Sequence, residues 1–169
     1  KVVRSFDDKK AKLADEKTPE NWMSLDRAMG GVVALTFSPD GKQLAVCGVS
    51  FADFARSFDR ISRLTRSVTG PGRVKVWDVA SGKMNYDLAG HDSHVNDVAF
   101  SPDGSMLATA GNWLTPDDWG TGVILWSAHT GSEIRRFETT ANGGTNSIAF
   151  SPDNQSLAIG TQRFDNSNS

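Results

Sequence analysis

The sequence predicts an all-β fold built from repeated units of four antiparallel strands. A Phe-Ser-Pro-Asp motif recurs three times, at residues 37–41, 100–104 and 150–154, with Gly in the fifth position of the first two copies and Asn in the third. Short runs of β-type residues flank each copy. Such a motif between two runs is typical of a hairpin, because Pro fixes φ and Gly or Asn accepts a positive φ. Each unit therefore begins with a β-hairpin.

Third and fourth strands follow in two of the units. Residues 74–78 and 123–127 are predicted third strands that contain Trp77 and Trp126, and each leads into a Gly-containing turn and a further β-type run. Residues 1–6 align with that last run and form one further strand. Together with two complete units and half of another, this strand makes about 2.75 predicted units. The predicted division is residues 1–6 as the last strand of a preceding unit, 32–88 and 95–137 as complete units, 145–161 as the first half of another, and insertions at 7–31, 49–72 and 112–121.

The composition is that of a soluble globular domain and excludes several classes of protein. The 169 residues are 38% hydrophobic and 22% charged, and the net charge of −2 gives no bulk attraction to nucleic acid or an anionic membrane. The single cysteine, Cys47, excludes an internal disulfide and a multi-cysteine metal site. No apolar stretch is long enough to span a membrane, and residues 1–6 lack the apolar core of a signal peptide. The compartment stays unknown, with the cytoplasm slightly favoured.

These repeats resemble the WD-repeat β-propeller family, in the Ser-Pro-Asp-Gly-rich style common in bacteria. The resemblance rests on the three hairpin motifs, on the Trp77-Asp78 end of a third strand, and on Gly90-His91 before the next unit. It implies four-stranded blades around a central channel and a docking platform rather than an enzyme. Because a propeller closes with about four to eight blades, we expect the sequence to be a segment of a longer chain.

The resemblance also implies a polar network. In the family this network joins the His of Gly-His, a Ser or Thr on the second strand, an Asp in the following turn and the Trp of the third strand. His91, Thr109 and Trp126 match three of these positions, and the insertion at 112–121 leaves the Asp unassigned. We interpret all three as structural residues, with Trp77 as the counterpart of Trp126.

The other units lack this network. Ala28 and Ala141 hold the His position, and Val46 and Ile159 hold the position on the second strand. We therefore expect those blades to be held together mainly by apolar packing.

The three insertions fall in only two types of connection, fourth strand to first strand and second strand to third strand. In an up-and-down blade both types open on the same face of the propeller. Because loops on a rigid scaffold commonly carry function, this face is the predicted binding face.

The insertion at 49–72 carries a helical pattern. Its apolar residues fall at steps of three and four, and its arginines lie largely on another side, which is typical of an amphipathic helix. The apolar residues are Phe51, Phe54, Phe58, Ile61 and Leu64, and the arginines are Arg56, Arg60 and Arg63. We expect a short helix over residues 51–66, which is either a lid on the propeller's own face or a docking helix for a partner.

The insertion at 112–121 contains two tryptophans, Trp113 and Trp119, on either side of Asp117 and Asp118. Tryptophans in loops often anchor a peptide or a sugar. Alternatively, they cover the neighbouring insertion and hold it in place. The two adjacent aspartates do not provide the alternating oxygen ligands of a calcium loop.

Together these features favour a non-enzymatic platform for protein–protein interaction. Its partner would be another protein or another domain of the same longer chain, without nucleic acid, membrane or cofactor. The alternative is a small-ligand or enzyme site at the mouth of the channel, built from the inserted loops. A homodimer that closes a ring is a less favoured arrangement.

Overall fold

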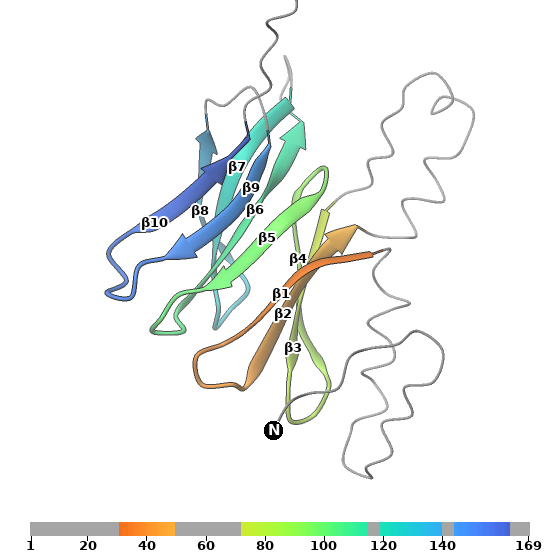
Figure 1. The fold of residues 1–169 in the computed structure, drawn as a ribbon. Coiled ribbons are helices and arrows are strands. Elements are labelled where there is room, and N and C mark those ends of the chain that lie inside the picture. The colour runs from red at the N-terminus through yellow and green to blue at the C-terminus, as the bar shows by residue number, and fades with distance from the viewer. Residues whose placement is uncertain (1–30, 50–71, 115–118, 140–143, 163–169) are drawn as a thin grey trace, which may run out of the picture.

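The computed structural model describes residues 31–49, 72–114, 119–139 and 144–162, and all regular structure in these ranges is β-strand. The strands form three antiparallel sheets, each in chain order (Figure 1). The first sheet contains β1 (Gly31–Phe37), β2 (Gln43–Val49), β3 (Gly72–Asp78) and β4 (Met84–His91); the second contains β5 (Val95–Phe100), β6 (Met106–Leu114), β7 (Trp119–Ser127) and β8 (Glu133–Thr139); the third contains β9 (Thr145–Phe150) and β10 (Leu157–Thr161). The predicted all-β fold of four-stranded antiparallel units is thereby confirmed.

The sheets pack face to face through their first strands. Strand β5 contacts β1 and β2 of the first sheet, and β9 contacts β5 and β6 of the second (Figure 1). Successive blades of a propeller pack in this way around a central axis. The described residues therefore form two complete blades and the inner half of a third.

The predicted hairpins form because the turn motif satisfies its own polar groups. Ser38 Oγ donates to Asp40 Oδ1 at 2.7 Å and accepts from the Gln43 amide at 2.9 Å. Gly41 and Gly104 have φ values of 69° and 72°, and Asn154 holds the same place with a φ of 62°. Asn tolerates this left-handed conformation, which explains why the third motif folds like the first two.

Two apolar layers hold the sheets together. In the layer between the first two sheets, Trp126 and Phe100 meet Ala45, Cys47 and Val74. The layer between the second and third sheets contains Ala108, Ala110, Val123 and Ile148.

The structure differs from the sequence expectation at residues 112–121. The range is not a free insertion, because β6 runs to Leu114 and β7 begins at Trp119. The pairs Asn112↔Thr121, Trp113↔Gly120 and Leu114↔Trp119 continue the β6–β7 ladder. The β-forming residues Trp, Leu and Thr thus lengthen both strands, and only residues 115–118 lie between them.

Other expectations fall outside the described residues. These are the strand at 1–6 and the helix at 51–66. The described part of the chain contains no helix that is long and apolar enough to cross a membrane.

Candidate functional site

The antiparallel order of the strands gives the sheets two different ends. The hairpins β1–β2, β3–β4, β5–β6, β7–β8 and β9–β10 all turn at one end, here called the short-turn end (Figure 1). The even-numbered strands finish at the opposite end, here called the long-connection end. Residues 50–71, 115–118 and 140–143 connect described strands at this second end. Chain-length variation between blades is therefore concentrated at the long-connection end.

The groups of the short-turn end are used within the turns. Asp103 Oδ1 accepts from Ser101 Oγ at 2.6 Å and from the Ser105 amide at 3.0 Å. These hydrogen bonds, that of Ser101 first, lower the pKa of Asp103 to about 2. The serine hydrogen bonds of Asp40 and Asp153 likewise lower their pKa values. The carboxylates of this end are thus committed to holding the turns.

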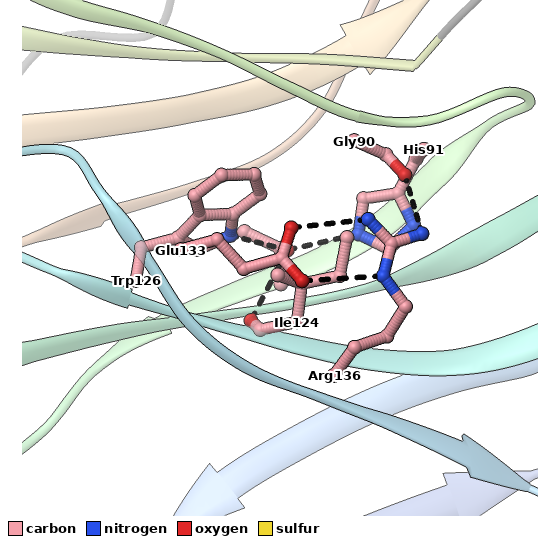
Figure 2. A network of polar contacts seen from close by, with 7 residues as sticks. Gly90, His91, Ile124, Trp126, Glu133 and Arg136 are labelled. Carbon is pink, nitrogen blue, oxygen red and sulfur yellow. Dashed lines mark hydrogen bonds and ion pairs between the residues drawn. The ribbon is translucent and has the colours of Figure 1, made fainter.

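A buried polar network joins the first two blades, as Figure 2 shows. Trp126 Nε1 donates to Thr109 Oγ1 at 2.9 Å, and His91 Nε2 lies 2.9 Å from the same oxygen. His91 is only 3% exposed. Burial, followed by the nearby Arg136 charge, lowers the pKa of His91 to about 4, so the imidazole is neutral at pH 7. The arrangement suits a structural histidine that links β4 to β6.

Arg136 supports the same junction from β8 (Figure 2). Its Nη1 donates to the Gly90 carbonyl of β4 at 3.0 Å, and its Nη2 donates to Glu133 Oε2 at 3.1 Å. A guanidinium held by Glu133 therefore crosses from the second blade to the first.

The long-connection end holds a cluster of buried and half-buried hydroxyls that sequence reasoning missed. Thr121 Oγ1 lies 2.8 Å from Thr145 Oγ1 and accepts from the Thr145 amide at 2.8 Å. Thr139 Oγ1 donates to the Thr121 carbonyl at 3.0 Å. These bonds tie β7 and β8 to the start of β9. The only sequence signal is a Thr near the start of β7, at the end of β8 and at the start of β9.

The register also corrects the assignment of the His position in the second blade. Thr139 pairs with Thr121 as His91 pairs with Gly72. Thr139 rather than Ala141 therefore corresponds to His91. Ala141 precedes Thr145 by the same number of residues as His91 precedes Val95, so spacing to the next strand indicates a different residue from the register.

The predicted recognition residues are only partly described. Residues Phe51, Phe54, Arg56, Phe58, Arg60 and Arg63 lie outside the described residues. Trp113 and Trp119 lie on paired strands at the tip of β6–β7, one register step apart. The structure thus brings the backbone of both tryptophans to the long-connection end.

The β4–β5 connection and strand β6 meet at the long-connection end. The β4–β5 connection lies against β6, since the Ser93 amide donates to the Asn112 carbonyl at 3.2 Å. Asn112 Oδ1 is buried and accepts no hydrogen bond from the described residues. Within the described ranges no group of three or more His, Cys, Asp or Glu side chains gathers.

Sheets that pack face to face through their first strands, with hairpins at one end, define a β-propeller assembly of blades. A family model described as "WD domain, G-beta repeat" matches residues 82–119, which run from the turn after β3 to the start of β7. The chain belongs to the WD-repeat family.

Two curated proteins are similar in sequence to this chain. Protein HIR1 of Yarrowia lipolytica is 30% identical over 76% of this chain, and the match covers 11% of HIR1. MST50-interacting protein 11 of Pyricularia oryzae is 32% identical over 52% of this chain, and that match covers 25% of the fungal protein. The chain thus spans a quarter or less of these two relatives.

A solved structure supports the fold. Hydrazine synthase of Kuenenia stuttgartiensis matches 75% of this chain and 36% of its own with a TM-score of 0.55. The sequence identity is 22%, so the likeness concerns the fold alone.

Proposed function

We propose that this chain forms part of a non-enzymatic platform that binds a protein, or another domain of the same polypeptide, through the long-connection end. The WD-repeat family and its relatives support a protein-interaction role, and one relative carries interaction with MST50 in its name. The net charge of −2 offers no general attraction to nucleic acid.

One observation carries the choice of end. All connections that differ in length between the two described blades meet the sheets at the long-connection end, whereas every hairpin at the other end stays short. A rigid set of strands with variable connections at one end is a common arrangement for recognition, because the scaffold fixes where the loops emerge.

The side chains at the two ends also favour binding at the long-connection end. The short-turn carboxylates accept hydrogen bonds from their own turns and are poorly available to a partner. At the other end Trp113 and Trp119 occupy neighbouring strand ends. Tryptophan is enriched among residues that dominate binding energy.

The residues proposed to contact the partner come from the β2–β3 connection of the first blade and from the paired ends of β6 and β7 in the second. They are Phe51, Phe54, Arg56, Phe58, Arg60 and Arg63 from the first blade, and Trp113 and Trp119 from the second.

Site-specific photo-cross-linking tests the proposal with two matched positions on one hairpin. Asn146 is exposed near the start of β9 at the long-connection end, and Gln155 is exposed in the β9–β10 turn. A photoreactive residue at Asn146 should form adducts with a partner in cell extract, whereas the same residue at Gln155 should not. Adducts formed only from Gln155 would place binding at the short-turn end and refute the proposal.

A further inference from the structure

Strand β6 of the second blade extends beyond its inner neighbour β5 at the long-connection end. Strand β5 begins at Val95, which pairs with Gly111 of β6. Past this pair, among the described strands, residues 112–114 of β6 pair with β7 alone. These residues and residues 119–121 of β7 are called here the β6–β7 ribbon. In the first blade β2 ends at Val49, where it still pairs with β1, so the ribbon distinguishes the second blade.

The β4–β5 connection occupies the first position on the β5 side of the ribbon. The Ser93 amide donates to the Asn112 carbonyl at 3.2 Å, and the Asn112 amide donates to the His94 carbonyl at 3.3 Å. Asn112 therefore directs both of its main-chain groups away from β7. Opposite it, the Thr121 carbonyl points to β8, because it accepts from Thr139 Oγ1 at 3.0 Å. Asn112 and Thr121 are thus a pair without hydrogen bonds between them.

This pair determines where the main-chain groups of Leu114 point. Hydrogen-bonded and non-hydrogen-bonded pairs alternate along an antiparallel ladder. Trp113 and Gly120 are therefore a hydrogen-bonded pair, whereas Leu114 and Trp119 are not. The amide and carbonyl of Leu114 consequently point to the β5 side, as those of Asn112 do. Within the described ranges no main-chain group pairs with Leu114 on that side.

We propose that this edge of β6 binds an extended segment of the partner protein by main-chain pairing with Leu114. The segment would take, one step further along β6, the place that Ser93 and His94 take beside Asn112. An extended segment fits because it has free amide and carbonyl groups, whereas a helix uses most of these groups internally. This inference rests on the proposed binding role of the long-connection end and names the form of the partner segment.

Two substitutions at one position test the main-chain contact. Leu114→Ala keeps the amide at the edge of β6, and Leu114→Pro removes it. Proline is tolerated where an edge amide has no ladder partner, and the Leu114 amide does not bond to β7. The partner captured by cross-linking at Asn146 should bind the Pro variant about fivefold or more weakly than the Ala variant, the effect of one lost hydrogen bond. Circular dichroism of both variants checks the fold.

Methylation of the partner's own amides tests the same contact on the unsubstituted protein. Overlapping peptides that cover the partner identify the segment that binds, and each amide nitrogen of that peptide is then methylated in turn. Affinity should fall about fivefold or more at the residue that pairs with Leu114 and change little at its two neighbours, whose amides point away from β6.

Three results would overturn the proposal while adducts at Asn146 leave the binding role of this end intact. They are equal affinities of the Pro and Ala variants, failure of every partner peptide to bind, and a bound peptide with the circular dichroism spectrum of a helix. Absence of any adduct from Asn146 would instead refute both the binding role and this inference.

Discussion

At the residue scale, the tryptophans of the two third strands differ in the hydrogen bonding of their indole nitrogens, and one neighbouring side chain causes the difference. Trp126 Nε1 donates to Thr109 Oγ1, whereas Trp77 Nε1 is buried and has no acceptor among the described residues. The register explains this, because Val46 occupies in the first blade the position of Thr109 in the second. A buried donor without a partner lowers stability.

Val46→Thr should therefore stabilise the chain. The new hydroxyl can accept from Trp77 and donate to the Lys75 carbonyl, as Thr109 does toward the Ile124 carbonyl at 3.4 Å. We expect a gain of about 1 kcal/mol in the free energy of unfolding, measured by urea denaturation. The control is the same substitution in a Trp77→Phe background, where no indole donor exists and the gain should vanish. An equal effect in both backgrounds would contradict the hydrogen-bond explanation.

The buried His91 should make stability depend on pH between about 6.5 and 4. Its pKa falls from 6.5 to about 4 on folding, so in this window the unfolded chain binds a proton that the folded chain does not. Stability is therefore complete above pH 6.5, decreases as the pH falls, and has lost on the order of 3 kcal/mol near pH 4. The lowered pKa values of Asp40, Asp103 and Asp153 act below this window.

Urea denaturation at several pH values measures this dependence, with His91→Gln as the non-titrating control. The variant should show a clearly flatter profile from pH 6.5 to 4. A profile as steep as that of the unsubstituted chain would mean that other groups cause the loss.

At the element scale, two glycines are required for different reasons. Gly41 is required by its positive φ, and Gly72 is required by the close approach of a neighbouring segment. Gly41 has a φ of 69°, and a Cβ there would meet nothing within 4 Å. Gly72 begins β3 beside the β4–β5 connection, and a Cβ there would lie 2.0 Å from the Ser93 carbonyl oxygen.

Alanine substitutions should reflect this difference. Gly41→Ala should cost about 1–2 kcal/mol, the penalty of a left-handed residue with a side chain. Gly72→Ala should cost at least twice as much, because backbone of the neighbouring connection must move. Thermal unfolding of both variants compares the two losses, and losses of equal size would refute the described packing at β3.

Most strands could be predicted from local sequence signals. Contacts between different sheets could not be predicted from such signals. The hairpins follow from Ser-Pro-Asp-Gly because that motif satisfies itself within a few residues. The Thr121–Thr145 contact joins residues on different sheets, and no local pattern indicates it. The extension of β6 to Leu114 was missed because Asn112 and Gly120 interrupt the β-type runs in the sequence.

The polar network shows the same limit. The resemblance to WD repeats identified His91, Thr109 and Trp126, and the distances place them together. Arg136 could not be found in this way, because its contact with Gly90 joins residues of two different sheets.

At the scale of the whole molecule, each repeat places one sheet on the next and presents two unlike ends. The short-turn end is nearly the same in every repeat, whereas the long-connection end differs between them. The central claim is that this second end captures the partner.

Partner capture by two matched variants tests this claim most directly. In one variant, residues 51–66 are replaced by a short Gly-containing turn, which should leave the sheets folded because loop length has a small effect on stability. In the other, the short-turn residues Lys42, Ser105 and Gln155 are substituted by Ala. The affinity for the partner identified by cross-linking at Asn146 is then measured, with circular dichroism as the check of folding. The account predicts that the first variant loses capture and the second retains it; the opposite pattern in folded proteins would contradict it.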